Sequence, residues 1–197
     1  TCLNVGCIPS KAIIHAADEF DRARHFAGEN ALGIKAGAPT IDLARTVAWK
    51  DGIVKRLTGG VGGLLKKSKV RVIEGRAEFI DGKSVAVKTK EGLLHIDAEN
   101  IVIATGSVPV ELPFLKFGGD VISSTGALAL ARVPKTLAIV GAGYIGLELG
   151  IAFAKFGAKV TIVEAMDRIL PTYDAELTRP VAKRLKALGV EVLLGAK

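Results

Sequence analysis

Apolar and charged positions alternate at helical spacing over the first third of the chain. From Ser10 to Ala27, apolar residues recur every three or four positions with charged residues between them, which predicts an amphipathic helix. A loop rich in Gly and Ala is expected over residues 30–39, and Thr40 is expected to cap a second helix. That helix carries one apolar stripe, which predicts core packing. The stripe consists of Ala44, Val47, Ala48, Val54, Leu57, Val61 and Leu65.

The pattern changes to short strands from Val70 onward. Four apolar runs, separated by turn signals such as Asp81-Gly82 and Glu91-Gly92, predict a small antiparallel meander. These runs cover residues 70–74, 77–80, 84–89 and 93–97. The next run, 100–106, is apolar at consecutive positions and predicts a buried strand that ends in a tight turn. Prolines and glycines over 108–119 predict an irregular connection between two domains.

Strands and helices alternate in the last third of the chain. The predicted elements are a strand over 136–140, a helix through about Phe156, a strand over 159–164, a helix over 174–189 and a strand over 190–194. Asp174 is a suitable N-cap for the second of these helices, and Pro180 is expected to end or kink its first turns. This order predicts an α/β fold with a parallel sheet.

The turn after the strand over 136–140 carries a glycine pattern. Gly141-Ala142-Gly143-Tyr144-Ile145-Gly146 follows a predicted strand and opens a predicted helix, as a dinucleotide-binding fingerprint requires. Gly141 would permit the turn, and Gly143 would let a pyrophosphate approach the backbone. Gly146 would let the helix and the strand pack closely.

An acidic residue completes this fingerprint. Glu164 ends the next predicted strand, 23 residues after Gly141, where a carboxylate accepts hydrogen bonds from the adenosine ribose. Its charge would repel a 2′-phosphate, and the first arginine beyond it is Arg168. The sequence therefore favours NAD over NADP.

The chain has two cysteines, Cys2 and Cys7. An ideal helix rises about 1.5 Å per residue, so their spacing prevents a disulfide unless the turn between them is distorted. Gly6 and Pro9 allow that distortion. A bridge across so short a loop would add little stability, which favours redox exchange over a stabilising role.

Two alternatives remain for these thiols on spacing alone. They are two unrelated reduced cysteines, or two zinc ligands joined by His15 or His25. The spacing matches no common structural zinc site, and a fourth ligand is missing. We expect His15, His25 and His95 to be ordinary surface histidines.

Composition limits the class of protein. With 49% hydrophobic and 24% charged residues, the sequence predicts a globular chain with a core. The net charge of +7 comes from scattered Lys and Arg, and aromatic residues make up 5%, so we expect no nucleic-acid partner. No apolar run reaches the length of a membrane span, so we expect no membrane partner. Because Thr1 is not Met, any targeting peptide is lost from view.

The stretch Thr1 to Lys11 resembles the redox-active disulfide motif of the flavoprotein disulfide reductases, the class I pyridine nucleotide-disulfide oxidoreductases. Within that family, Leu3, Ile8 and Ser10-Lys11 are most similar to the dihydrolipoyl dehydrogenases. The resemblance implies two Rossmann-like domains, both incomplete here. Residues 1–107 would be the C-terminal part of an FAD-binding domain. Residues 108–197 would be a linker and the N-terminal part of an NAD-binding domain, so the chain is expected to be an internal fragment.

The resemblance also implies roles for individual residues. Cys2 would exchange with the lipoyl disulfide, Cys7 would lie against the flavin, and Lys11 would lie beside flavin N5, paired with Glu148. These four are the expected catalytic residues. Ala77 would contact the FAD adenine through its backbone. The expected cofactor-binding residues are Thr1, Cys2, Lys11, Ala77, Thr105, Gly106, Ser107, Gly141, Ala142, Gly143, Tyr144, Ile145, Gly146, Glu148 and Glu164.

The implied activity is the reoxidation of dihydrolipoamide, carried by the acyltransferase of a 2-oxo acid dehydrogenase complex, through the disulfide and FAD to NAD. The segment 168–177 resembles forms that serve branched-chain 2-oxo acids. Family members carry a catalytic His and Glu in a dimerisation domain, so a homodimer is expected, in the bacterial cytoplasm or the mitochondrial matrix. The alternatives are a mercuric or glutathione reductase, and a nucleotide-binding module without redox turnover.

Overall fold

The computed structural model describes residues 1–196, and these form two compact units. The first combines residues 1–55 with the chain from Pro109 onward, and the second comprises Arg56–Val108. Sequence analysis placed the boundary between an FAD-binding part and an NAD-binding part between residues 107 and 108. This assignment of cofactors to the two parts stays a prediction.

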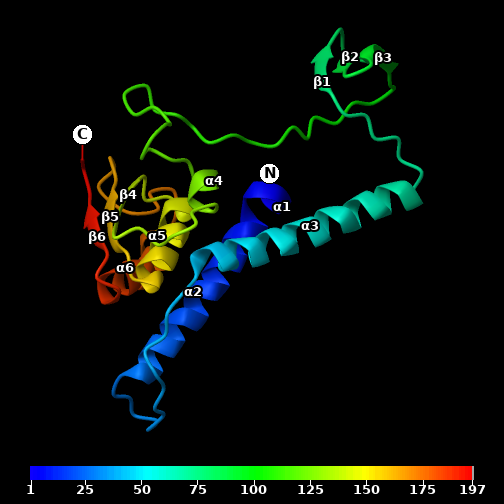
Figure 1. Cartoon of the computed structure of the whole chain (residues 1–197). Coiled ribbons are helices and arrows are strands. Elements are labelled where there is room, and N and C mark those ends of the chain that lie inside the picture. The colour runs from blue at the N-terminus through cyan, green and yellow to red at the C-terminus, as the bar shows by residue number, and fades with distance from the viewer. Residues whose placement is uncertain (197) are drawn as a thin grey trace. The chain divides into compact units, whose positions relative to one another are not determined.

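Helices open the first unit (Figure 1). Helix α1 spans Cys2–Val5, α2 spans Cys7–Ala27, and α3, which begins in this unit, spans Leu43–Lys67. The predicted helix from Ser10 is confirmed but starts earlier, at Cys7. The cap expected at Thr40 is wrong, because Asp42 Oδ1 accepts the hydrogen bond from Arg45 N at 3.1 Å. An N-cap directly precedes the first helical residue, which is Leu43.

The apolar stripe predicted for α3 is buried only in part. Val47 packs against the core, whereas Ala44, Ala48, Leu57 and Val61 are exposed. The prediction of core packing is therefore wrong for most of the stripe. Periodicity identifies the face of a helix that can be buried, but burial also requires an element to cover that face.

A parallel sheet forms the centre of the first unit. Its strands are β4 (Thr136–Val140), β5 (Lys159–Val163) and β6 (Glu191–Leu193), in the order β4-β5-β6. The connecting helices are α5 (Tyr144–Phe156) and α6 (Ala175–Ala187), and the short α4 covers Ser124–Ala127. All five elements predicted for this region are confirmed within a few residues. Pro180 lies inside α6 without ending it.

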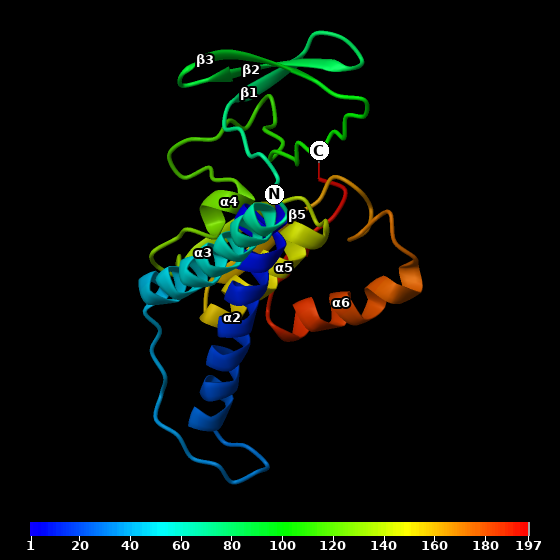
Figure 2. The same ribbon diagram turned by 90° about the vertical axis from the view of Figure 1, so that its right-hand side faces the viewer.

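The core of the first unit joins α2 to the parallel sheet. Phe153 of α5 and Ile162 of β5 are among its fully buried side chains, together with Ile13 of α2 and Leu185 of α6. Helix α2 packs directly against α5 (Figures 1 and 2). This packing holds the cysteine segment close to the glycine fingerprint, although about 130 residues separate the two in sequence.

The second unit contains an antiparallel meander. Strand β1 (Arg76–Phe79) pairs with β2 (Ser84–Thr89), which pairs with β3 (Gly92–Asp97). The predicted strand over 70–74 is absent, and residues 100–106 form no strand either. Val102 is 86% exposed, so the prediction of a buried strand there is wrong. A consecutive apolar run becomes a buried strand only between partner strands, and no described strand pairs with it.

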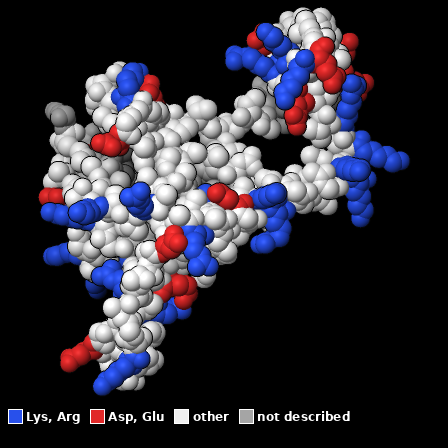
Figure 3. Space-filling model, in the orientation of Figure 1, with Lys and Arg blue, Asp and Glu red and all other residues white. Residues whose placement is uncertain are grey.

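Basic and acidic groups are interspersed on the face drawn in Figure 3. Several of the bases in the first unit are paired with acids, among them Lys11, Lys155 and Arg184. Over residues 1–196, no helix combines the length and apolar character needed to cross a bilayer. The parallel sheet and its connecting helices give the structure the α/β class predicted from the sequence.

Candidate active site

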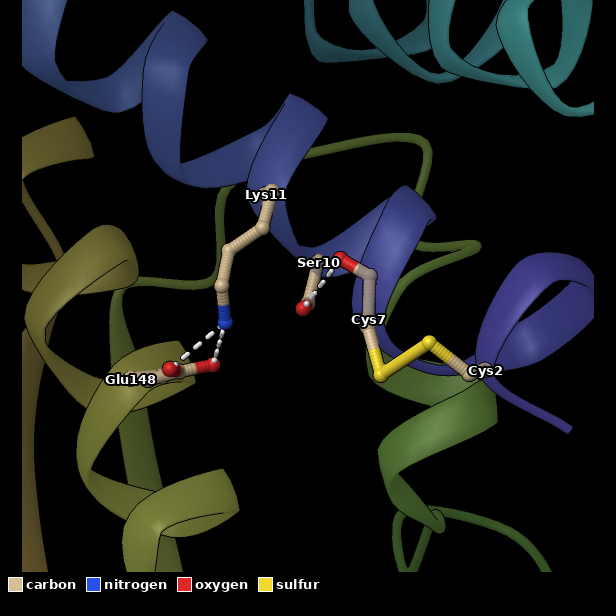
Figure 4. The surroundings of a disulfide bond; sticks show 5 residues. All are labelled: Cys2, Cys7, Ser10, Lys11 and Glu148. Carbon is tan, nitrogen blue, oxygen red and sulfur yellow. Dashed lines mark hydrogen bonds and ion pairs between the residues drawn. A yellow bond between two sulfur atoms is a disulfide. The ribbon is translucent and has the colours of Figure 1, made fainter.

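A disulfide joins Cys2 to Cys7 at the start of the chain (Figure 4). Gly6 separates α1 from α2, and its backbone, at φ −126° and ψ −112°, is not helical. This break brings the two cysteine Cα atoms to 4.7 Å, within the range for a disulfide. A Cβ at Gly6 would lie 3.1 Å from Cys2 Cα, so a larger residue would crowd the turn. The predicted distortion at Gly6 is confirmed.

The position of Cys7 favours its thiolate. Cys7 is the first residue of the 21-residue helix α2, and no side chain caps that N-terminus. The dipole of a helix N-terminus stabilises a negative charge placed there. Both cysteines are exposed in this chain. The Ser10 hydroxyl donates a hydrogen bond to the Cys7 carbonyl at 3.0 Å.

An ion pair lies close to this disulfide. The Lys11 ammonium on α2 contacts both carboxylate oxygens of Glu148 on α5, at 2.6 and 2.7 Å (Figure 4). Lys11 and Glu148 side chains are 58% and 35% exposed. Sequence patterns alone give no reason to pair these two residues, and the family resemblance predicted the pair. The structure brings them together.

The glycine fingerprint forms the turn between β4 and α5. Gly141 has a φ of +101°, a conformation that residues with a Cβ rarely adopt. A Cβ at Gly146 would lie 2.3 Å from the Gly141 carbonyl oxygen, whereas a Cβ at Gly143 would meet no protein atom within 4 Å. The fold itself therefore requires glycine at positions 141 and 146. At position 143 the fold leaves open space beside the N-terminus of α5, which suits an approaching phosphate.

Glu164 fastens this loop to the end of β5. Its carboxylate accepts hydrogen bonds from the amides of Met166, at 2.9 Å, and Ala142, at 2.7 Å. These two bonds, the one from Met166 first, hold the pKa of the Glu164 carboxyl below its ordinary value. Sequence analysis predicted only a ribose contact for this residue. Each carboxylate oxygen can accept a further hydrogen bond, so ribose binding and loop fastening are compatible.

The whole chain, residues 1–197, matches the family model described as pyridine nucleotide-disulphide oxidoreductase. The chain belongs to this family. The Cys2–Cys7 disulfide, Lys11 and the glycine loop between β4 and α5 thus lie in a chain of the family that the resemblance predicted.

Relatives and solved structures agree with this assignment. The chain is 60% identical over 196 residues to a dihydrolipoyl dehydrogenase from Pseudomonas aeruginosa. This match covers 99% of the chain and 42% of that protein. It is 48% identical to the Geobacillus stearothermophilus dihydrolipoyl dehydrogenase, of which it covers 41%. The structure matches the HOCl-induced flavoprotein disulfide reductase RclA from Escherichia coli, with a TM-score of 0.77 and 34% identity over 100% of this chain and 41% of that one. The chain thus spans about two-fifths of the length of these family members.

A structure of LpdA from Mycobacterium tuberculosis has the same fold. The TM-score is 0.86 at 24% identity, and the match covers 98% of this chain and 42% of that one. The agreement over nearly all of the chain supports the α/β arrangement described above.

The structure also describes the remaining predicted cofactor-binding residues. Ala77 on β1 and the coil residues Thr105, Gly106 and Ser107 belong to the second unit, and all four are exposed. Tyr144 is 59% exposed and does not pack in the core. Thr1 and Ile145 are exposed as well. The cofactor roles of these residues stay predictions.

The three histidines are exposed, as expected. His15 lies beside Trp49 and His25 beside Phe26, with ring centroids 6.2 and 5.8 Å apart. Within residues 1–196, no group of three His, Cys, Asp or Glu side chains is arranged to hold a metal ion.

Sequence analysis missed a second ion pair between α2 and α5, formed by Asp18 and Lys155. Its signal was present in the sequence. Asp18 follows Lys11 by seven residues and Lys155 follows Glu148 by seven, with the charges exchanged. That spacing is two helical turns, which places both pairs along one helix contact.

The hydrogen bonds of Glu164 lead to a prediction for pH dependence. A lowered native pKa means that the ionised carboxylate stabilises the fold at neutral pH, and that this contribution is lost as the pH falls through the native pKa. We expect Glu164→Gln to lower stability at pH 7 by about 1.5–3 kcal/mol, the range for hydrogen bonds to a charged group. The difference should shrink between about pH 5 and pH 3. Thermal unfolding of the full-length protein across this range is the measurement, and a difference independent of pH would contradict the assignment.

Proposed function

We propose that the full-length protein containing this chain is a dihydrolipoyl dehydrogenase that oxidises the dihydrolipoamide of a 2-oxo acid dehydrogenase complex, with NAD as the acceptor. The observation that carries the proposal is the exposed Cys2–Cys7 disulfide, which lies in the same compact unit as a dinucleotide-binding loop. The identity of 60% to the Pseudomonas aeruginosa enzyme supports the choice of substrate.

The thiol half of the proposed reaction is a double exchange. A thiolate of dihydrolipoamide attacks Cys2 Sγ, the Cys2–Cys7 bond breaks, and Cys7 leaves as a thiolate. The second substrate thiol then attacks the mixed disulfide, which releases lipoamide and leaves Cys2 and Cys7 as a dithiol. Two electrons and two protons pass to the protein. The N-terminus of α2 stabilises the negative charge that Cys7 acquires as it leaves, because the positive end of the helix dipole lies there.

FAD, when bound, relays the electron pair from the dithiol to the nicotinamide ring. The sum of the reaction is dihydrolipoamide plus NAD⁺ to lipoamide, NADH and a proton. Cys7 and Lys11 would face the flavin. Thr1, Ala77, Thr105, Gly106 and Ser107 are the remaining proposed FAD contacts.

NAD would lie on the turn between β4 and α5. Its pyrophosphate would face the amides at the start of α5, where the open space at Gly143 accommodates it. Glu164 would accept hydrogen bonds from the ribose hydroxyls with the lone pairs that Ala142 and Met166 leave unused. Ile145 and Tyr144, exposed in the same first turn, would border the nucleotide.

Lys11 and Glu148 would act together in this scheme. An ammonium beside the disulfide stabilises the Cys7 thiolate and any negative charge that develops on a neighbouring acceptor. Glu148 holds this flexible, partly exposed side chain in one direction through two hydrogen bonds. The pair therefore orients a positive charge at the point of electron transfer.

A panel of substrates tests the proposed activity. The full-length protein should reduce NAD with dihydrolipoamide, and it should reduce lipoamide with NADH. Glutathione disulfide and mercuric ion with NADPH are the competing substrates. Faster turnover with either of these would overturn the proposal in favour of a glutathione or mercuric reductase, and no turnover with any substrate would favour a nucleotide-binding module. A homodimer in a reducing compartment is part of the same proposal.

Glu164 provides a test of the proposed nucleotide. We expect Glu164→Ala to weaken NADH binding by about 10-fold, because the ribose loses a charged hydrogen-bond acceptor. NADPH should bind less weakly relative to NADH, because the repulsion of the 2′-phosphate is removed. Fluorescence titration of both nucleotides measures the ratio. An unchanged NADH affinity and an unchanged ratio would contradict the role of Glu164 in selecting NAD.

A further inference from the structure

Two ion pairs with exchanged charges cross from α2 to α5. Lys11 on α2 meets Glu148 on α5, and Asp18 on α2 meets Lys155 on α5. In both pairs the partners are 137 residues apart in sequence. The second pair therefore lies two turns further along both helices.

The contact between these two pairs is apolar and closely packed. Ile13 and Ala17 of α2 and Phe153 of α5 are buried there in one cluster. Phe20 and Phe156 continue the contact, with ring centroids 6.2 Å apart. Such packing brings the helices together, but apolar contacts are not directional and specify helix register less sharply than charges do.

Lys155 is the most enclosed charge of the four. Its side chain is 12% exposed, whereas the Asp18 side chain is 42% exposed and that of Lys11 58% exposed. A mostly buried ammonium left without its partner is strongly unfavourable, which ties Lys155 to Asp18. The Lys155 carbonyl also accepts a hydrogen bond from Arg24 Nη1 at 3.3 Å, a second link between the two helices.

The exchanged signs select a single register. If α2 slid by two turns against α5, Lys11 would face Lys155, or Asp18 would face Glu148, and like charges would meet in either case. A uniform arrangement, with both bases on one helix, would keep opposite charges together after such a slide. Alternating charges across a helix pair thus disfavour the wrong register as well as favouring the correct one.

We propose that Asp18 and Lys155 are a positioning pair, which sets the register of α2 against α5 and so holds the Lys11 ammonium against Glu148 beside the disulfide. This inference rests on the proposed function only for the consequence of the Lys11 position in redox turnover. Asp18 and Lys155 act through Lys11 and do not themselves contact the disulfide.

Asp18→Asn in the full-length, FAD-containing protein tests the pair with little change in shape. We expect kcat for lipoamide reduction to fall about 10-fold, as is usual when a group that orients a functional residue is lost. The KM for NADH should change less than about twofold, because the glycine loop is untouched. The long-wavelength absorbance of the reduced protein, which reports a thiolate beside the flavin, should also decrease.

Asp21→Asn is the matched control. Asp21 lies on the same helix and pairs with Arg184 of α6 at 3.4 Å, so the variant loses the same charge without touching the contact between α2 and α5. We expect kcat and the absorbance band to stay unchanged. The charge exchange Asp18→Lys with Lys155→Asp restores an opposite-charge pair, and it should recover both quantities to within about threefold of the original protein.

The possible outcomes separate the two proposals. A fall in melting temperature for Asp18→Asn with unchanged kcat and absorbance would overturn the positioning role, and so would a failure of the exchanged pair to recover them. Glu148→Gln is measured in parallel. If Glu148→Gln has an effect and Asp18→Asn has none, only the positioning role fails. If Glu148→Gln has no effect, the proposed action of Lys11 and Glu148 is wrong. The positioning role of Asp18 and Lys155, which acts through Lys11, is then wrong as well.

Discussion

Replacing Cys7 with serine in the full-length protein should abolish lipoamide turnover, with kcat lowered by at least about 1000-fold, as expected when a reacting nucleophile is removed. Serine cannot form the disulfide, so the electron pair of dihydrolipoamide has no route into the protein. NADH binding should be unchanged, because the glycine loop between β4 and α5 does not include Cys7. Steady-state kinetics and NADH titration measure both effects.

Cys2→Ser is the informative companion to this variant. It also removes the disulfide and should stop lipoamide turnover, but it keeps Cys7 at the N-terminus of α2, where the thiolate is stabilised. We expect Cys2→Ser to show a permanent long-wavelength absorbance band and Cys7→Ser to show none. Bands of equal strength in the two variants would contradict the assignment of Cys7 as the thiol beside the flavin. Full lipoamide turnover in either variant would remove the disulfide from the mechanism.

Two alanine substitutions in the glycine loop should have different effects. Gly146→Ala should lower the stability of the fold, and Gly143→Ala should weaken NADH binding. Gly146→Ala places a Cβ 2.3 Å from the Gly141 carbonyl oxygen, so the turn or α5 must shift. We expect a loss of stability of about 1–3 kcal/mol, as for other overpacked sites. Gly143→Ala meets no protein atom within 4 Å and keeps an ordinary φ of −74°, so its stability should fall by less than about 1 kcal/mol.

Gly143→Ala, which should have the smaller effect on stability, should have a large effect on nucleotide binding. Its Cβ would occupy the space proposed for the pyrophosphate, so NADH affinity should fall at least about 10-fold in a protein of nearly unchanged stability. Thermal unfolding and fluorescence titration of both variants provide the comparison. A Gly143→Ala protein that binds NADH normally would show that the open space beside α5 is not a phosphate site.

The α/β unit was predictable because local sequence and tertiary context agree there. A local sequence pattern predicts each of the strand, the turn and the helix between Thr136 and Phe156. The backbone conformation and close contact that require glycine at positions 141 and 146 both arise within the same turn. The break at Gly6 was predictable for the same reason, since a disulfide over so short a spacing requires a non-helical turn.

The errors fall where burial depends on distant partners. The apolar run at 100–106 and the later part of the α3 stripe have the composition of buried elements. Val102, Leu57 and Val61 are nonetheless exposed, because no described element covers them. Periodicity shows which side chains of a segment can be buried, but it does not show whether another element packs over them. The Asp18–Lys155 pair was missed for a related reason, because each charge alone resembles an ordinary solvated position on a helix.

An anaerobic titration of the full-length protein with NADH tests the central claim most directly, because it follows electrons from the nucleotide to the disulfide. We predict a yellow protein that takes up two electrons per active site and develops a long-wavelength absorbance band from the Cys7 thiolate. Adding lipoamide should then remove the band and restore the original spectrum. A protein that binds NADH without any change in its visible spectrum would contradict the proposed oxidoreductase and leave only a nucleotide-binding role.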